Sequence, residues 1–327
     1  MDIRTVKEYV GADWDAVIGR IASVLRSDIS LLNATNEAIL SNSGKQLRPL
    51  LAILFARACA GGKVSEATIR YAASSELLHN ATLLHDDVAD DSDQRRGMPT
   101  IRSMMGPSVS VLVGDYWLVK AMELILGDSR SDAKVIRIFS KTLSDLAEGE
   151  MLQLQKARSG DTDQEDYIRI IYNKTASLFE AACLSAAVSV SAPEPFEKAA
   201  RDYAVALGLA FQIKDDILDY DGTESVGKPL GVDILEQKIT MPLLGAFENV
   251  SQEEQDRVRE MVRNIVGQPE LRDGIVGFAK DNGGIEYAER VLDEYIEKAV
   301  KALEVLPESF EKKCLEELAY FTAKRKR

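Results

Sequence analysis

The sequence predicts an all-α protein, and three observations support this fold class. Apolar residues recur at helical spacing along most of the 327 residues, often within alanine-rich runs. Segments that alternate between polar and apolar residues, as half-buried strands do, are hard to find. Glycine and proline divide the chain into segments long enough for ordinary or long helices. We therefore expect a bundle of helices.

The breakers give the expected order of the helices along the chain. They fall at Gly61-Gly62, Gly97 to Pro107, Gly127-Asp128, Ser159 to Asp163, Pro193 to Pro195, Asp221 to Gly231, Gly267 to Pro269 and Asn282 to Gly284. These breakers are too short to be interdomain linkers, and no shift in composition separates two halves. Although the length fits one or two domains, we expect a single domain over residues 1–327.

Charge and cysteine usage exclude several classes of function. The chain has 53 acidic and 40 basic residues and a net charge of -13, so its surface as a whole repels nucleic acid. The three cysteines are far apart and show no CxxC spacing, which argues against a disulfide framework or a zinc site and favours a reducing compartment.

The hydropathy pattern indicates no transmembrane segment. The densest apolar stretches, Leu50 to Ala60 and Tyr203 to Ile213, span 11 residues each, whereas a membrane span needs about 20. The first residues also lack the basic and then apolar order of a secretory signal. We expect a cytoplasmic protein.

Two similar acidic clusters carry the strongest chemical signal. Leu83 to Asp90 and Gln212 to Asp219 each contain the pattern DDxxD. On a helix, residues i and i+4 share a face about 5.4 Å apart, which pairs Asp86 with Asp90 and Asp215 with Asp219. Two carboxylates 4 Å apart repel by roughly 4 kcal/mol at an effective dielectric of about 20, a cost that bound cations can reverse. Hard carboxylate oxygens suit Mg²⁺ that is shared with substrate phosphates.

A solvated helix face is the alternative interpretation of one such cluster. Both clusters, however, directly follow apolar residues, whereas a solvated face should show polar residues for several turns upstream. We therefore expect each cluster to lie at the rim of a pocket.

Basic residues at expected loop positions bracket both clusters. They are Lys45, Arg48, Arg95, Arg96, Lys174, Lys228 and Lys238. Arginine forks and lysine point charges beside a divalent metal are what a diphosphate requires, although ordinary surface cations remain an alternative for each residue alone.

Five motifs together resemble one family over nearly the whole chain. In order, they are GKQLRP, LLHDDVADDSDQRRG, NKT, FQIKDDILD and GKPLGVDILEQKITMPL. This set resembles the trans-isoprenyl diphosphate synthases, or polyprenyl synthetase family, and is most similar to the long-chain, octaprenyl-type members. The resemblance implies an isoprenoid-synthase bundle around a central cavity, with the two acidic motifs facing each other across its mouth, and a homodimer.

The resemblance also implies roles for individual residues. Asp86, Asp90 and Asp215 would ligate Mg²⁺ that bridges an allylic diphosphate, with Asp219 as a further ligand and Asp87 in support, and three ions would be bound with substrate. The same allylic diphosphate would be held by Arg95, Lys174, Thr175, Gln212, Lys228 and Lys238. Isopentenyl diphosphate would be bound by Lys45, Arg48, His79 and Arg96. Asp216 belongs to the catalytic set with the other motif aspartates, Lys174 and Lys228.

The implied reaction is ionisation, condensation and elimination. Cations stabilise charge on the departing diphosphate, the isopentenyl double bond captures the allylic cation, and a proton is then lost. The sequence offers no Ser/His or Cys/His constellation, and this reaction needs no protein nucleophile. The basic residues Lys324 to Arg327 are either a solvated tail or a segment that helps to close the site.

Small residues before the first acidic motif predict a long product. Ala81 and Thr82 lie about 7 and 6 Å down the helix axis from Asp86, where bulky aromatic residues limit growth in short-chain members. We place the tunnel floor at Ile136 and Phe139. The expected product is a long-chain polyprenyl diphosphate, such as a quinone side chain, with transient membrane contact on its release.

Three other functions are weighed against this one. A geranylgeranyl diphosphate synthase would differ only in where the tunnel is blocked. A class I terpene cyclase would not need the second diphosphate site that GKQLRP and His79 indicate. A noncatalytic subunit should have lost motif residues, yet here the main departures are Met98 and Asp91, where the family often has Lys and Glu.

Overall fold

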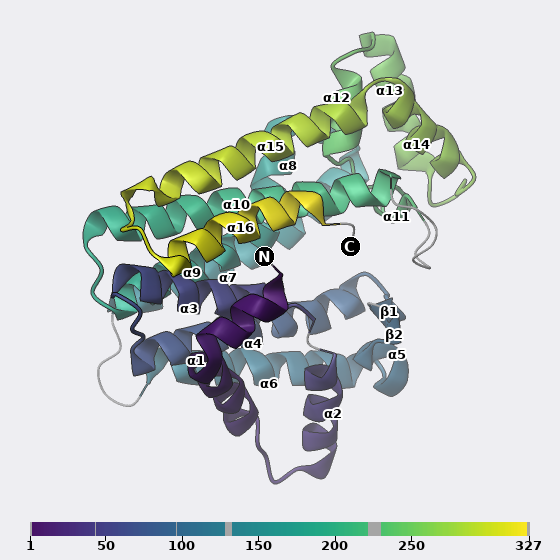
Figure 1. The fold of residues 1–327 in the computed structure, drawn as a ribbon. Coiled ribbons are helices and arrows are strands. Elements are labelled where there is room, and N and C mark those ends of the chain that lie inside the picture. Colours follow the sequence, from purple (N-terminus) through teal and green to yellow (C-terminus); the bar gives the residue numbers. More distant parts are fainter. Residues whose placement is uncertain (1, 43, 96, 128–132, 222–229, 326–327) are drawn as a thin grey trace. The chain divides into compact units, whose positions relative to one another are not determined.

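The computed structural model describes residues 2–42, 44–95, 97–127, 133–221 and 230–325. These residues are almost entirely helical, with one short hairpin, which confirms the predicted all-α class (Figure 1). They divide into two compact units: residues 1–140, 181–201 and 305–315 form unit 1, and residues 141–180, 202–304 and 316–327 form unit 2. The expectation of a single domain remains a prediction.

Unit 1 contains the N-terminal helices and the hairpin. Its elements are α1 (Ile3–Val24), α2 (Ser30–Ser41), α3 (Leu47–Cys59), α4 (Glu66–Ala89), β1 (Gln94–Arg95), β2 (Met98–Pro99), α5 (Ile101–Met105), α6 (Pro107–Leu126), the first residues of α7 (Ala133–Ser159), most of α9 (Ser177–Ser189) and the first residues of α10 (Glu194–Asp221) and α16 (Phe310–Lys324). Helix α4 packs against both α3 and α6, and α1 packs against both α3 and α4.

The core of unit 1 follows the apolar runs of the sequence. Leu50 to Ala56 on α3 are fully buried, and Trp117 of α6 is buried with its indole N–H donating to Asn36 Oδ1 at 2.8 Å. Asn36 in turn donates to the carbonyl of Leu25 at 2.9 Å, so one buried amide links α2, α6 and the end of α1. Helix α4 begins at a capping box in which Ser65 and Thr68 satisfy each other's backbone N–H groups.

Unit 2 contains the central and C-terminal helices. Its elements are most of α7, α8 (Gln164–Ile171), the π-helical turn η1 (Tyr172–Ala176), the start of α9 (Ser177–Ser189), most of α10 (Glu194–Asp221), α11 (Val232–Leu235), α12 (Met241–Phe247), α13 (Gln252–Asn264), α14 (Leu271–Asp281), α15 (Gly284–Ala302), most of the 3₁₀ turn η3 (Leu303–Val305) and the end of α16 (Phe310–Lys324).

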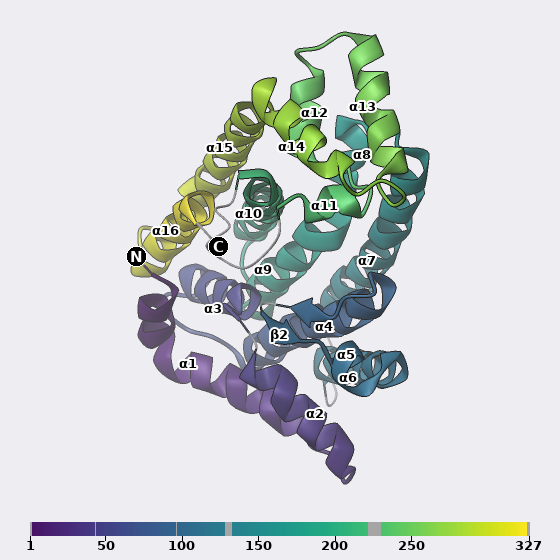
Figure 2. The same ribbon diagram turned by 90° about the vertical axis from the view of Figure 1, so that its right-hand side faces the viewer.

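Helix α12 packs against other helices of unit 2, and Figure 2 shows it grouped with α13 and α14. All seven of its residues are buried, and it packs against α14 and α15. A Cβ atom on Gly245 would lie 2.6 Å from Cβ of Tyr287, so α12 and α15 approach too closely for any larger residue at this position.

Within the described ranges, no helix combines the length and the apolar character that are needed to cross a bilayer.

Candidate functional site

The first acidic motif lies where α4 ends. The backbone N–H of Asp90 at the C-cap donates to the Asp86 carbonyl at 2.8 Å, so the two residues are one helical turn apart, as their spacing predicts. Asp86 is half-buried and Asp90 is exposed. The motif therefore lies at the end of an apolar helix, where carboxylates can reach an ion.

Asp87 has a different environment from its neighbours. It is buried and accepts a hydrogen bond from Arg95 Nε at 2.8 Å. Burial raises the pKa of Asp87, while the Arg95 guanidinium acts in the opposite direction. Arg95 is placed by the β1–β2 hairpin, in which it pairs with Met98. The next residue in the sequence, Arg96, lies outside the described residues.

The second acidic motif lies on α10, and its three aspartates have three different partners. Asp215 forms an ion pair with Arg325 at 2.9 Å. Asp216 is buried and accepts hydrogen bonds from two side chains of unit 2. Asp219 accepts from the backbone N–H groups at the start of α11, Val232 and Asp233, both at 3.1 Å. The first residues of α11 are thereby anchored to the acidic helix.

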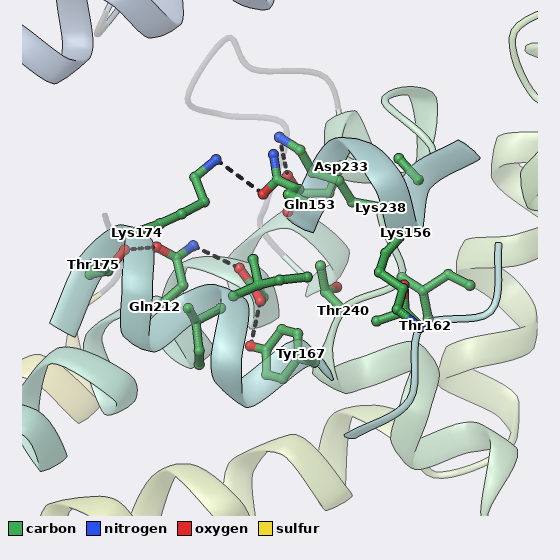
Figure 3. Close-up of a pocket in the computed structure, with 15 residues that line it drawn as sticks. Gln153, Lys156, Thr162, Tyr167, Lys174, Thr175, Gln212, Asp233, Lys238 and Thr240 are labelled. Atoms are coloured by element: carbon green, nitrogen blue, oxygen red, sulfur yellow. Dashed lines mark hydrogen bonds and ion pairs between the residues drawn. The ribbon is translucent and has the colours of Figure 1, made fainter. Parts of the chain in front are cut away.

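A cavity of about 130 Å³ lies within unit 2 beside this helix (Figure 3). It is lined by residues of α7, α8, η1, α10, α11 and the segment before α12: Gln153, Lys156, Ala157, Thr162, Tyr167, Ile170, Ile171, Lys174, Thr175, Gln212, Asp216, Asp233, Lys238, Ile239 and Thr240. Four residues predicted to bind the allylic diphosphate therefore line one cavity, namely Lys174, Thr175, Gln212 and Lys238.

Lys174 and Thr175 do not lie in a loop, as the sequence had suggested, but in the π-helical turn η1 between α8 and α9. The N–H of Ser177 donates to the carbonyl of Tyr172, five residues back, and the Ser177 hydroxyl donates to the carbonyl of Asn173 at 2.7 Å. The polar backbone is thus satisfied without a loop, and the extra residue of the turn changes the direction of the side chains. The loop prediction was wrong because nothing local in NKT ends a helix.

Glycines on two neighbouring helices make room for this turn. A Cβ on Gly149 of α7 would lie 2.7 Å from Cβ of Asn173, and a Cβ on Gly208 of α10 would lie 2.5 Å from Cα of Ala176. Both distances are shorter than a carbon–carbon contact allows. Close packing on both sides therefore fixes the turn that carries Lys174 and Thr175.

A chain of hydrogen bonds crosses the wall of the cavity. The Thr175 hydroxyl donates to Gln212 Oε1 at 2.8 Å, and Gln212 Nε2 donates to Asp216 Oδ1 at 2.9 Å. Tyr167 OH donates to the other oxygen, Asp216 Oδ2, at 2.6 Å. Burial raises the pKa of Asp216, and hydrogen bonds from Tyr167 and Gln212 oppose that rise.

The lysines of the cavity are held by acidic or amide oxygens. Lys174 Nζ lies 2.6 Å from Glu150 Oε1 and donates to Gln153 Oε1 at 3.0 Å. Lys238 is paired with Glu236 and lies 3.9 Å from Asp233. Burial raises the pKa of Asp233 to about 6, with Lys238 opposing the rise and the nearby Asp219 adding to it. The cavity therefore places lysine ammonium groups beside acidic and amide oxygens, and an anion such as a phosphate could take the place of those oxygens.

The residues predicted to bind isopentenyl diphosphate lie in unit 1. Lys45 is exposed before α3, Arg48 is buried in the first turn of α3, and His79 is half-buried on α4. The fourth, Arg96, and the predicted ligand Lys228 lie outside the described residues.

The residues of the predicted product tunnel also lie in unit 1. Ala81 is buried on α4, and the Thr82 hydroxyl donates to the His79 carbonyl at 2.8 Å. Phe139 is buried, with its ring 6.3 Å from that of Tyr71, which lies ten residues or about 15 Å before Ala81 on α4. Ile136 is half-buried.

Three residues near the second motif were missed by the sequence reasoning: Tyr167, Asp233 and Arg325. Tyr167 precedes Lys174 by seven residues, a spacing that could have placed it on the same helical face. Arg325 belongs to the basic tail, but only the structure shows that its guanidinium is buried, donates to the Phe211 carbonyl at 2.6 Å and lies 3.8 Å from that residue's ring.

The fold and the site together define a protein of the all-α class with two aspartate-rich helix segments and a polar pocket beside the second. Comparison with known proteins identifies its relatives. The polyprenyl synthetase family model matches residues 29–273. The chain is 37% identical over 328 residues to octaprenyl diphosphate synthase of Escherichia coli (strain K12), and the alignment covers 100% of both chains.

Solved structures agree with this result. A decaprenyl diphosphate synthase from Rhodobacter capsulatus superposes with a TM-score of 0.90 at 33% identity, over 100% of both chains. A polyprenyl synthase from Caulobacter crescentus CB15, complexed with calcium and isoprenyl diphosphate, gives 0.89 at 34% identity, over 100% of this chain and 98% of that one. The chain belongs to the polyprenyl synthetase family. It is therefore an enzyme of the trans-prenyltransferase class.

Proposed function

We propose that this enzyme condenses isopentenyl diphosphate with an allylic diphosphate to make a long-chain all-trans polyprenyl diphosphate. One observation carries the proposal: the chain is similar over its full length to an octaprenyl diphosphate synthase, and it retains both DDxxD motifs on helices. The polar pocket beside the second motif supports it, since two lysines and a glutamine there provide donors for a diphosphate.

Members of the family use a divalent metal in catalysis. We propose Mg²⁺, held by Asp86, Asp90, Asp215 and Asp219, with three ions when substrate is bound. The donor set fits, because carboxylate oxygens are the ligands that Mg²⁺ prefers. No group of three or more acidic, histidine or cysteine side chains is preassembled for an ion among the residues described. Phosphate oxygens of the substrate would therefore complete the coordination, as is common for Mg²⁺.

We propose that the protein's own cations also take part in the reaction. Mg²⁺, when bound, supplies positive charge that stabilises the departing diphosphate. Lys174 and Lys238 add positive charge in the pocket of unit 2, where Glu150 and Glu236 hold their ammonium groups. We assign the allylic diphosphate to these residues with Arg95, Thr175, Gln212 and Lys228, and isopentenyl diphosphate to Lys45, Arg48, His79 and Arg96.

We propose a product longer than geranylgeranyl diphosphate, such as a quinone side chain. The buried Ala81 leaves the helix surface before the first motif without a bulky side chain, and the aromatic pair Phe139 and Tyr71 lies about 15 Å further along α4. Relatives with long products support this, since a nonaprenyl diphosphate synthase of Rhodobacter capsulatus is 35% identical over 301 residues. A cytoplasmic location and transient membrane contact on product release remain predictions.

A product assay tests the function. The purified enzyme is incubated with farnesyl diphosphate, labelled isopentenyl diphosphate and Mg²⁺, and the products are dephosphorylated and separated by chain length. We expect chains of more than four isoprene units. Products of four units or fewer would identify a geranylgeranyl-type synthase, and a cyclised hydrocarbon without incorporation of label would identify a terpene cyclase.

Replacement of Asp86 distinguishes an enzyme from a noncatalytic subunit. We expect Asp86→Ala to lower turnover by at least ~10², because it removes a metal ligand at the leaving group. Asp91→Ala is a matched control, since Asp91 lies just beyond the motif, is exposed and pairs with Arg102. Equal turnover in the wild type and the Asp86 variant would contradict the proposed site.

A further inference from the structure

The hydrogen-bond chain in the wall of the cavity has a defined polarity. Two donors, Tyr167 OH and Gln212 Nε2, are directed at the two oxygens of Asp216, which therefore acts as the acceptor for both. Gln212 must turn its amide NH₂ group toward this carboxylate, because the opposite orientation would place two oxygens against each other. Its carbonyl oxygen then faces Thr175 and accepts that residue's hydroxyl proton.

This polarity determines which hydrogen-bond donors and acceptors the cavity wall presents to a ligand. The Thr175 proton is used within the chain, so its hydroxyl presents lone pairs to the cavity. The Gln212 amide has a second N–H besides the one bound to Asp216. A fully ionised diphosphate accepts hydrogen bonds and donates none. Among these hydrogen-bonded residues, Gln212 is therefore the donor that is available to it.

Asp216 is also unlike the other two aspartates of its motif. Only 2% of its surface is exposed, and both of its oxygens are bound to protein donors. Tyr167, which supplies one of them, is equally buried at 2% and lies on a different helix, α8. Without the tyrosine hydroxyl, the carboxylate would keep a single donor and could rotate, and Gln212 would lose its fixed partner.

We propose that Tyr167 is a positioning residue for the allylic diphosphate: acting through Asp216, it holds the Gln212 amide with an N–H directed at the bound diphosphate. Asp216 in turn is a positioning residue and not a metal ligand. The inference deepens the proposed function, because the ligand of the wall is the diphosphate assigned there.

The test uses Tyr167→Phe, which removes the hydroxyl and keeps the ring. Binding of inorganic diphosphate in the presence of MgCl₂ is measured by isothermal titration calorimetry on the full-length protein. We expect the dissociation constant to rise about three- to tenfold, as for loss of one hydrogen bond at a charged ligand. In steady-state assays, KM for farnesyl diphosphate should rise more than kcat falls.

Tyr287→Phe is the matched control. Its hydroxyl donates to Gln164 at 3.1 Å, it lies in the same unit, and it does not line the cavity. We expect it to bind diphosphate as the wild type does. A melting temperature for each variant separates loss of folding from loss of binding, and Gln212→Glu, which replaces the proposed donor by an acceptor, should weaken binding even if Tyr167→Phe proves too unstable to purify.

A double-mutant cycle tests whether Tyr167 acts through Asp216. Asp216→Asn combined with Tyr167→Phe should bind diphosphate no more weakly than Asp216→Asn alone, since the two changes interrupt one chain. Additive losses, or a folded Tyr167→Phe variant with the wild-type dissociation constant, would overturn the inference. Failure of the wild type itself to bind diphosphate with Mg²⁺ would instead contradict the proposed function.

Discussion

At the second acidic motif, each aspartate has its own partner, and that partner determines the environment of its carboxylate. Its three aspartates are spaced along the helix as in the first motif, yet their environments differ. Asp215 is paired with an arginine, Asp216 is buried and Asp219 anchors a short helix. The sequence predicts the carboxylates and their helical spacing, because both are local properties. The partners of Asp215 and Asp216, namely Arg325 and Tyr167, depend on tertiary packing and could not be predicted from DDxxD.

Arg325 gives a prediction about metal affinity. Its guanidinium is 2.9 Å from Asp215 Oδ1, so a cation already occupies this carboxylate before a metal binds. In Arg325→Gln, Mg²⁺ no longer competes with the guanidinium, and the Mg²⁺ concentration for half-maximal binding of inorganic diphosphate should fall about three- to tenfold. Calorimetric titrations at several Mg²⁺ concentrations provide the measurement.

Lys280→Gln is the control for this change, because Lys280 forms a comparable ion pair with Asp221 at the end of α10, at 3.3 Å. It should leave the Mg²⁺ requirement unchanged. An unchanged or higher requirement in Arg325→Gln would show that the arginine stays at Asp215 when the metal binds.

Asp233 gives a prediction about pH. Burial raises its pKa to about 6, above its ordinary value near 4, so the folded state favours the protonated form. The stability that Asp233 contributes is present below pH 4 and is lost as the pH rises through about 6. Asp233→Asn does not titrate. Without metal, this variant should melt ~2 to 5 °C above the wild type at pH 8 and by a clearly smaller margin at pH 4.5. A pH-independent difference in thermal denaturation would refute this assignment.

At the scale of elements, the sequence predicts helices well and their irregularities poorly. The breaker Gly61-Gly62 separates α3 from α4, and α4 ends at the first acidic motif, as expected. The π turn at Tyr172–Ala176 was not predicted, because its extra residue is held by neighbouring helices and not by a local breaker. Gly149 and Gly208 were the only sequence signal of that packing, and a glycine within a helix does not by itself indicate which neighbour approaches it.

The close approach of α10 to this turn can be tested at Gly208. A Cβ there would lie 2.5 Å from Cα of Ala176, so Gly208→Ala must displace one of the two helices. We expect a loss of about 1–3 kcal/mol in the free energy of unfolding and weaker diphosphate binding, because the turn carries Lys174 and Thr175. Denaturant titration and calorimetry measure the two effects.

Gly274→Ala on α14 is the matched control for overpacking. Its Cβ would meet only Cε of Met261, at 3.6 Å, so helix propensity should stabilise this variant by about 0.5–1 kcal/mol. Similar effects of the two substitutions would show that the packing around Ala176 is not limiting.

At the scale of the molecule, the sequence predicts the helical fold class. The hydropathy pattern alone, however, does not distinguish apolar residues that are buried from those that lie on the surface. Helix α6 is apolar on two faces. Val113, Trp117 and Ala121 are buried in unit 1, whereas Leu112 and Val119, seven residues apart, are 67% and 54% exposed. A helix that is apolar all round is usually buried, so its second face favours coverage by another protein surface.

We propose that this surface belongs to a second copy of the chain, in line with the homodimer that the family resemblance implies. If α6 forms the contact of a dimer, Leu112→Glu would place a charge in it and should raise the dissociation constant of the dimer at least tenfold, as measured by sedimentation velocity over a range of concentrations. Val266→Glu alters a more exposed apolar residue of unit 2, at 74%, and should leave the dimer intact. A monomeric wild type, or a Leu112 variant that dimerises normally, would exclude α6 as the interface.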